Sequence, residues 1–580
     1  MEKILKIFTK ESGSINQAAI LLGSFTLLSQ ILALFRDRSI AHFIGPSPSL
    51  DAYYAAFRVP DLIFISIASL ASITVLIPFI VAKMPAHQSA VGNGDNKVSE
   101  TAQKYLNDVF TVFFSFMVLV SLVAFFLMPY LISFIAPGFD SPYQAKVILL
   151  SRIMLLSPIL MGLSNLFGTV TQLFRKFFIY SLSPIFYNLG IIIGVIFLYP
   201  VFEIDGLAFG VALGALMHFG VQFFAARSCG FTPKFSFSRN TAGKTFFPFA
   251  INFKDIKSTV LTSLPRTLGL AFNNFALIFI IAMASFLKSG SISIFNFSFN
   301  LQSVPLNIIG ISYAVAAFPT LAKSFSGGKT EEFKKHLKEA SRAIVFWSLP
   351  VIFLFIVLRA QIVRVILGSG SFSWDNTRLV AASLAIFSVS ILAQGMITLL
   401  SRSYYATGNT KRPLIVNFSC SVLIIILAYV FIHLFENIQT FRFFIESILK
   451  VNDIDGTEVL MLPLAYSVGT ILNFILQWIF IKKDFMPHEP FINKTFFQSL
   501  GASFFLGIVA YLSLNILSPI FGTTTFWGVF LQGFISGILG IMAAIVVLYL
   551  LKNEELKDLA KTINTKFWRA KIIAPSQEEL

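Results

Sequence analysis

The sequence predicts an all-α integral membrane protein with about fourteen transmembrane helices. Of its 580 residues, 56% are hydrophobic and only 12% are charged, a composition that excludes an ordinary soluble protein. Apolar runs of about 20 residues, the length that crosses a bilayer, recur along almost the whole chain. Lys and Arg also gather in alternate connections between these runs. Together these observations predict a multi-pass helical bundle.

Fourteen segments are long and apolar enough to span the membrane. Several of them contain proline, which membrane helices tolerate where neighbouring helices or a cavity satisfy the freed backbone groups. The predicted spans cover about residues 15–35, 52–82, 105–129, 145–170, 178–200, 204–225, 257–286, 291–321, 338–358, 379–405, 413–435, 459–481, 494–518 and 524–551.

The connections between the spans predict the orientation of the chain. Those on one side are basic, such as the connection with Lys329, Lys334 and Lys335, whereas the connection after residue 200 carries only Glu203 and Asp205. Cytoplasmic loops collect Lys and Arg, so both termini are expected in the cytoplasm. The same rule accounts for the formal charge of +16 without any nucleic-acid partner.

A weak internal repeat predicts two pseudo-symmetric lobes with an extra pair of C-terminal helices. The segments Pro78–Lys83 and Pro319–Lys323 each close the second long helix of their half, and transporters are commonly built from such repeats. The predicted division is an N-terminal lobe, a C-terminal lobe, an extra helix pair and a cytoplasmic amphipathic tail, at residues 1–250, 251–485, 486–551 and 552–580.

The motifs that would indicate an enzyme do not occur in the sequence. There is no Walker loop, dinucleotide-binding glycine pattern or nucleophile elbow. The six histidines are scattered, and Cys229 and Cys420 match neither metal nor disulfide spacing. We therefore expect no catalysis, no metal and no cofactor.

Charged residues cluster where the first two spans meet. Arg36, Asp37 and Arg38 are expected to close the first helix, Asp51 to open the second, and Arg58 to lie in its opening turns. A charge at membrane depth costs on the order of 3 kcal/mol or more, so it usually faces a partner or a wet cavity. The cluster is therefore the candidate site.

Two interpretations of the arginines stay open from the residues alone. A pair such as Arg36 with Asp51 could be purely structural and close the loop between the spans. Alternatively Arg36, Arg58 and Arg266 could bind a pyrophosphate headgroup, because guanidinium groups donate bidentately to phosphate in a low-dielectric cavity. Isolated amides and His218 are interpreted as packing between helices.

Several motifs resemble the MurJ (MviN) lipid II flippases of the MOP exporter superfamily. The similarity runs from about residue 24 to at least residue 483 and is carried by segments in both halves of the chain. They are Leu34-Phe35-Arg36-Asp37, Phe43-Ile44-Gly45, Asp51-Ala52-Tyr53, Phe57-Arg58-Val59-Pro60, Ala136-Pro137-Gly138-Phe139, Leu264-Pro265-Arg266 and Arg402-Ser403-Tyr404-Tyr405-Ala406-Thr407-Gly408.

The resemblance implies alternating access of two lobes around a cationic cavity in the bacterial cytoplasmic membrane. The implied substrate is lipid II, the undecaprenyl-pyrophosphate-linked peptidoglycan precursor, moved from the inner to the outer leaflet. The implied binding residues are Arg36, Asp37, Asp51 and Arg58, with Arg266 as the candidate from the second lobe. Membrane lipids and cell-wall synthesis proteins are the other expected partners.

The chain departs from the family pattern at several cavity positions. Gln30, Phe64 and Ile65 stand where the family has arginines, and Asn300 replaces another. Each replacement removes a charge-assisted contact to an anionic headgroup. The departures keep two alternatives open: export of a different polyprenyl-linked oligosaccharide on the same scaffold, or a non-transporting scaffold in cell-wall assembly.

Overall fold

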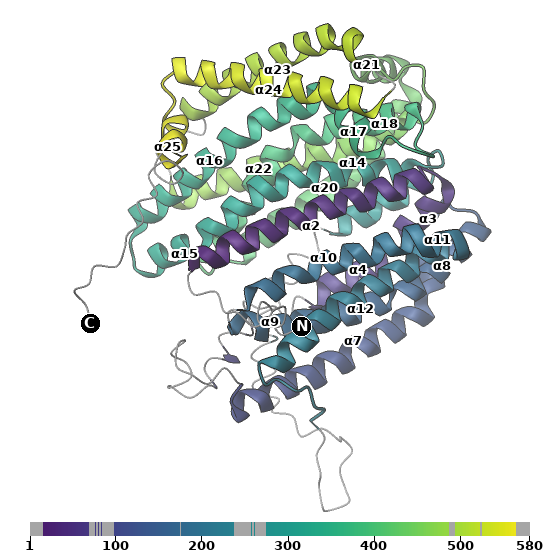
Figure 1. Ribbon diagram of the computed structural model, residues 1–580, viewed down its shortest axis with the longest axis vertical. Coiled ribbons are helices and arrows are strands. Elements are labelled where there is room, and N and C mark those ends of the chain that lie inside the picture. The colour runs from purple at the N-terminus through teal and green to yellow at the C-terminus, as the bar shows by residue number, and fades with distance from the viewer. Residues whose placement is uncertain are drawn as a thin grey trace, which may run out of the picture. The chain divides into compact units, whose positions relative to one another are not determined.

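The computed structural model describes residues 15–68, 98–174, 176–236, 274–486, 494–522 and 525–563, together with isolated positions between these ranges. Every regular element within them is a helix (Figure 1). The predicted fold class, an all-α membrane protein, is confirmed by these helices and their apolar composition.

Ten described helices are long and apolar enough to cross a membrane, or eleven if a pair bent by 43° counts as one span. Their bounds follow the predicted spans closely: the segment predicted at 413–435 is the helix Lys411–Asn437, for example. Parts of the predicted spans 52–82 and 257–286 lie outside the described residues. The number fourteen therefore stays a prediction.

The chain divides into two compact units that do not follow chain order. The first comprises Met1–Phe297, Ile366–Val380 and Thr410–Tyr466, and the second the remaining segments. The first unit contains α2 (Ile15–Phe43), α3 (Pro48–Ala56), α4 (Arg58–Ile63), η1 (Phe64–Ala68), α7 (Glu100–Ile135), α8 (Ser141–Met154), α9 (Leu156–Leu173), α10 (Phe177–Ile193), η3 (Gly194–Leu198), α11 (Tyr199–Phe202), α12 (Ile204–Ser228), α20 (Lys411–Asn437), α21 (Gln439–Leu449) and η5 (Thr457–Leu460). Four helices contribute residues to both units: α14 (Ser291–Leu306), α17 (Arg359–Leu367), α18 (Trp374–Val389) and α22 (Met461–Phe485).

Helix α10 is central to the packing of the first unit because it contacts α2, α9 and α12 (Figure 1). Glycines let the backbones of α10–η3 and α12 approach closely. A Cβ atom on Gly194 would lie 2.5 Å from the Cα of Gly210, closer than real Cβ contacts allow. Small residues serve this purpose at membrane helix interfaces, where backbone packing replaces the hydrophobic effect.

Helix α2 continues past the point where the sequence predicted its end. Arg36, Asp37 and Arg38 were expected to close it, but the helix runs to Phe43. The apolar run ends at these charges, but the helical backbone hydrogen bonds continue beyond them to Phe43. The Arg38 guanidinium donates to the carbonyl of Ile366 at 3.3 Å. The charges therefore lie within a helix rather than at its end.

The turn from α2 into α3 requires glycine at position 45. Gly45 has φ +64°, a conformation that costs other residues energy. A Cβ there would also lie 2.6 Å from the carbonyl oxygen of Ser371. After this turn the predicted second helix is interrupted at Phe57, so Asp51 lies on α3 and Arg58 begins α4.

The second unit comprises Ser298–Val365, Ala381–Asn409 and Ser467–Leu580. Its helices, besides the shared ones, are η4 (Asn307–Ile311), α15 (Ser312–Ser326), α16 (Thr330–Val357), α19 (Ile391–Ala406), α23 (Lys494–Phe521), α24 (Phe526–Leu550) and α25 (Glu554–Ile563). Helix α16 packs against α15, α19 and α23, and α23 packs against α24.

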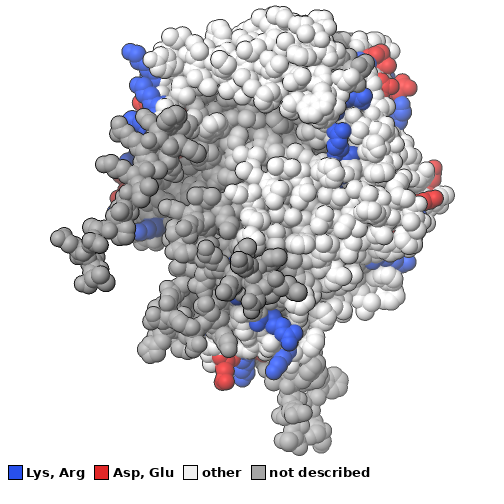
Figure 2. Space-filling model, in the orientation of Figure 1, with Lys and Arg blue, Asp and Glu red and all other residues white. Residues whose placement is uncertain are grey.

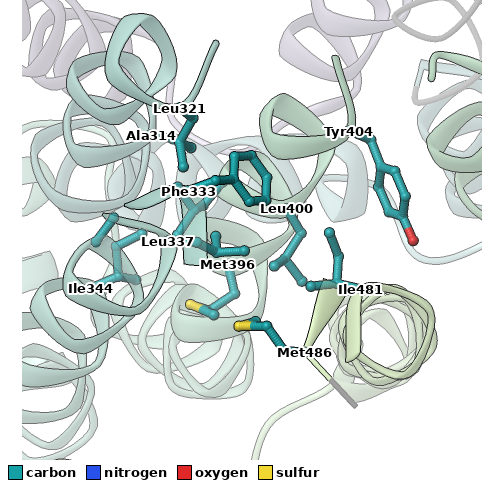
Figure 3. Close-up of a cluster of buried hydrophobic side chains, with 12 residues drawn as sticks. Ala314, Leu321, Phe333, Leu337, Ile344, Met396, Leu400, Tyr404, Ile481 and Met486 are labelled. Carbon is teal, nitrogen blue, oxygen red and sulfur yellow. The ribbon is translucent and has the colours of Figure 1, made fainter. Parts of the chain in front are cut away.

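A buried apolar cluster holds the second unit together (Figure 3). Phe333 and Leu337 from α16 meet Met396 and Leu400 from α19, and Ile481 of α22 joins them. All five are fully or almost fully buried. Figure 3 shows that these side chains point toward one another from separate helices.

Outside such clusters, large apolar side chains are widely exposed on the helices. Figure 2 shows few Lys, Arg, Asp or Glu side chains on the described surface that faces the viewer. Phe224, Tyr549 and Ile520 are each exposed by two thirds or more. A surface of this kind is stable when lipid is the solvent.

The described part of the predicted amphipathic tail is the helix α25. Its Glu554 lies 3.6 Å from Arg342 of α16, and its Glu555 accepts a hydrogen bond from Thr495 at 2.8 Å. Residues 564–580 lie outside the described ranges. A position of the tail on the cytoplasmic surface stays a prediction, as does the predicted division into four segments.

Candidate functional site

Arg36 lies within α2 and forms an ion pair with the next residue. Its Nε and Nη2 atoms donate to Oδ1 of Asp37 at 2.9 and 2.8 Å. Its Nη1 atom donates to the side-chain oxygen of Asn188 on α10 at 3.1 Å. The Arg36 side chain stays 21% exposed, whereas that of Asp37 is 4% exposed. Part of the Arg36 side chain is therefore still accessible.

Asn188 fixes the position of this arginine between α2 and α10. Its amide nitrogen donates to the hydroxyl of Ser29 at 3.3 Å and to the carbonyl of Pro184 at 3.1 Å. The amide oxygen remains directed at Arg36, and the amide is buried. A buried amide with all of these partners holds one orientation, which restricts the guanidinium in turn.

Asp51 contacts the beginning of α14 rather than an arginine. One carboxylate oxygen accepts from the backbone N–H of Gly290 at 2.6 Å. The other accepts from the backbone N–H and the hydroxyl of Ser293, at 2.7 and 2.5 Å. Asp51 is 2% exposed, and a carboxylate at a helix N-terminus is favoured by unsatisfied N–H groups and the helix dipole. Its partners are thus Gly290, directly before α14, and Ser293, in the first turn of that helix.

Arg58 contacts the same helix one turn further on. Its Nη2 atom donates to the side-chain oxygen of Asn296 at 2.7 Å, and Asn296 donates in turn to the carbonyl of Ile292. The Nε atom of Arg58 is buried and has no hydrogen-bond partner among the described residues. A buried donor left unpaired costs about 1–3 kcal/mol. Arg58 thus has donor capacity that a ligand or water could use.

The structure groups the predicted residues in two places. Arg36 and Asp37 pair on α2, while Asp51 and Arg58 both bind the first two turns of α14. Arg266 lies outside the described residues. Of the family departures, Gln30, Phe64, Ile65 and Asn300 are all half-buried, the first three in the first unit and Asn300 in the second.

Some partners were missed in the sequence because nothing local marks them. Gly290 and Ser293 carry no charge and lie about 240 residues from Asp51. Asn188 and Asn296 were interpreted only as packing amides, yet each binds an arginine. Ser293 and Asn296 are three residues apart and therefore share one helix face. This spacing was the signal that could have identified them as a pair of binding partners.

His218 is a satisfied interior residue, as expected from the sequence. Its Nδ1 atom lies 2.7 Å from the hydroxyl of Ser164, and both residues are buried. In the second unit, Gln394 likewise donates to Gln302 at 3.0 Å and to Ser390 at 2.9 Å. These polar groups join helices to one another, in keeping with their predicted packing role.

The fold defines a multi-pass membrane protein with the architecture of transporters. A solved structure titled as the inward-facing conformation of a multidrug resistance MATE family transporter of the MOP superfamily matches with a TM-score of 0.59. It is 16% identical, and the match covers 80% of this chain and 98% of that one.

The chain belongs to the lipid II flippase MurJ family. Residues 40–532 match the family model described as "Lipid II flippase MurJ". A solved structure titled "Lipid II flippase MurJ, inward closed conformation" matches with a TM-score of 0.70 at 20% identity. That match covers 93% of this chain and 100% of the other.

Two curated relatives illustrate the similarity in sequence. The probable lipid II flippase MurJ of Rhizobium tropici is 27% identical over 404 residues, which are 68% of this chain and 71% of the relative. The lipid II flippase MurJ of Burkholderia cenocepacia is 22% identical over 507 residues, 86% of this chain and 90% of the relative. The similarity therefore extends over most of both chains.

Proposed function

We propose that this chain is a flippase that moves lipid II from the inner to the outer leaflet of the bacterial cytoplasmic membrane. The observation that carries the proposal is the family match over residues 40–532. Relatives named lipid II flippase support the same substrate. Nothing in this proposal requires catalysis, because transport changes the position of the lipid and no covalent bond.

In this proposal Arg36 and Arg58 bind the pyrophosphate of the lipid. Both are half-buried cations on helices of the first unit, and Arg58 retains a buried donor without a partner in the described chain. Asp37 holds Arg36, whereas Asp51 positions the segment that carries Arg58. Arg266, which lies outside the described residues, would supply a further cationic contact to the headgroup during alternating access.

The proposed topology places both termini in the cytoplasm. Lys329 lies in the connection after α15, and Lys482 and Lys483 lie in the last turn of α22. At the other end of the spans, Glu203 precedes α12 and Asp205 lies in its first turn. Retention of basic loops on the cytoplasmic side supports this orientation. Release of the headgroup then occurs at the outer face.

The main alternative is a different polyprenyl-linked oligosaccharide. Gln30, Phe64, Ile65 and Asn300 favour it, because they replace cations of the family pattern. A pyrophosphate binds fewer guanidinium groups in a cavity without these cations. Discrimination between lipid-linked substrates would then depend more on contacts to the sugar. The same missing cations keep open a non-transporting scaffold for cell-wall synthesis proteins, whereas the retained Arg36, Asp51 and Arg58 argue against it.

Complementation tests the proposal. The resident lipid II flippase of a bacterium is depleted while this chain, or its Arg36→Ala or Arg58→Ala variant, is expressed. We expect the unmodified chain to restore growth and both variants to fail. Arg152→Ala is the matched control. Arg152, on α8, lies over the Phe125 ring of α7 and donates to the Phe125 carbonyl, and no described contact joins it to Arg36 or Arg58.

Failure of the unmodified chain, at normal abundance in the membrane, would contradict lipid II transport. Native mass spectrometry of the lipid that co-purifies would then separate the alternatives. A different polyprenyl-linked lipid would indicate another export substrate. Partner proteins without any such lipid would indicate a scaffold.

A further inference from the structure

Helix α21 follows α20 after the single residue Ile438 and is too short to cross a membrane. It has 11 residues, from Gln439 to Leu449. At 1.5 Å per residue it is about 17 Å long, against a hydrocarbon core of about 30 Å. Because it begins where a membrane span ends, it lies at the depth where that span leaves the bilayer.

The sequence of α21 is amphipathic. Phe441, Phe444, Ile445 and Ile448 have the spacing of one helix face, i, i+3, i+4 and i+7. The opposite face carries polar and basic groups, namely Gln439, Arg442, Glu446 and, at the C-cap, Lys450. Aromatic and aliphatic residues on one face and basic residues on the other are typical of helices in the plane of a membrane surface.

Polar contacts fix the rotation of α21 about its axis. Glu446 is 2% exposed, and its carboxylate accepts from Thr457 at 2.6 Å and from Arg442 at 2.9 Å. Arg378, on α18, donates to the carbonyl of Lys450 at 2.6 Å. In this rotation Phe444 and Ile448 of the apolar face are exposed, whereas Phe441 and Ile445 are half-buried.

The apolar face of α21 continues the lipid-facing surface of α20. Phe444 and Ile448 are 61% and 59% exposed. On α20, one of the described spans, large apolar side chains are exposed along its length, and Ile438 is exposed at the junction. The large apolar residues of α20 that are exposed are Ile415, Phe418, Val422, Ile426, Tyr429 and Val430. This continuity identifies lipid as the occupant of the face.

We propose that α21 is an interfacial anchor that binds the membrane surface at the end of α20. Phe444 and Ile448 lie among lipid acyl chains, and Arg442 and Lys450 lie toward the phosphate groups. On the proposed topology the anchor is in the outer leaflet. The anchor is a lipid-binding surface separate from Arg36 and Arg58 and does not depend on which lipid is transported.

The anchor also has a mechanical consequence. Asp453 and the carbonyl of Lys450 both bind Arg378, at 2.5 to 2.7 Å. The connection that follows α21 is thus joined to the beginning of α18. Membrane contact by α21 therefore restrains the depth of that end of α18 as well.

Two neighbouring phenylalanines provide a matched test. Phe443 and Phe444 are both 61% exposed, but Phe443 lies nearer the polar face. A nitroxide label is attached to Phe443→Cys or Phe444→Cys in the full chain, reconstituted in vesicles of phosphatidylethanolamine and phosphatidylglycerol. Accessibility to oxygen and to a water-soluble nickel complex is then measured by electron paramagnetic resonance. Ile426→Cys supplies the reference within the bilayer.

We expect the ratio of oxygen to nickel accessibility to be several-fold higher at position 444 than at 443, and closer to that at 426. Equal, water-like ratios at 443 and 444 would overturn the proposal, since the face would then be in water. Protection of 444 from both reagents would also overturn it, because protein would cover the face. Cys229 and Cys420 are buried, and labelling of the unmodified chain measures their background.

Discussion

The charged region around α2, α3 and α14 and the apolar cluster of the second unit are buried in opposite ways. The cluster around Phe333 and Met396 is stabilised by close packing and by the apolar area that it buries, with side chains from four helices, α15, α16, α19 and α22. The charged region is held by individual hydrogen bonds, such as those from Ser293 and Gly290 to Asp51. A packed cluster tolerates volume-conserving changes, whereas a buried carboxylate tolerates no loss of its donors.

The largest expected effect is on the apolar cluster. Replacing Phe333 by Ala removes a fully buried ring and leaves a cavity, so we expect a loss of about 3–5 kcal/mol in unfolding free energy. Unfolding of the detergent-purified chain by denaturant measures it. Phe504→Ala is the control, because Phe504 is exposed and should change stability by less than about 0.5 kcal/mol. Equal losses in both variants would contradict the cluster's role.

The next effect concerns the carboxylate of Asp51. Asp51→Ala leaves two backbone N–H groups and a hydroxyl without their acceptor, for which we expect a loss of about 3 kcal/mol. Asp51→Asn keeps one acceptor oxygen and should lose less. The same denaturant measurement on Asp375→Ala, an exposed carboxylate, gives the baseline. A variant as stable as that baseline would show that α14 does not need Asp51.

A smaller effect is expected at Asn296, the partner of Arg58. Asn296→Ala removes a hydrogen bond to a charged group, worth about 1.5–3 kcal/mol before the site relaxes. Part of this loss is recovered where water reaches the half-buried guanidinium. Thermal unfolding of Asn296→Ala beside Asn437→Ala, an exposed amide, measures the difference. A larger loss of stability in Asn437→Ala than in Asn296→Ala would contradict a stabilising role for the Arg58–Asn296 hydrogen bond.

Features that depend on neighbouring residues in the sequence could be predicted, whereas contacts between distant segments could not. Arg36 and Arg58 stood out because charges interrupt apolar runs, and the spans followed from the lengths of those runs. The end of α2 was misplaced because a helix continues through charges that find partners elsewhere, here at Ile366. The Arg36–Asn188 contact joins residues 152 positions apart and depends on helix packing that no local pattern encodes.

The smallest effect concerns pH and lies outside the spans. The hydrogen bond from Arg378 lowers the pKa of Asp453 below its ordinary value of 3.8. A lowered pKa contributes stability that is present above pH 3.8 and is lost as the pH falls through the folded-state value. We therefore expect Asp453→Asn to weaken the acid dependence of thermal unfolding below pH 4, whereas Asp455→Asn should leave it intact. An unchanged acid dependence of thermal unfolding in Asp453→Asn would contradict a stabilising role for the Arg378–Asp453 ion pair.

The measurement that tests the central claim most directly is lipid II transfer in vesicles that contain only the purified full chain. Labelled lipid II starts in one leaflet, and its arrival in the other is followed with time. We predict a transfer rate above that of protein-free vesicles. Arg36→Ala and Arg58→Ala should each reduce this rate about tenfold or more, because each removes one or two charge-assisted hydrogen bonds to the lipid. Arg152→Ala should transfer at the unmodified rate. Transfer that is absent with folded protein, or unaffected by either variant, would contradict the account.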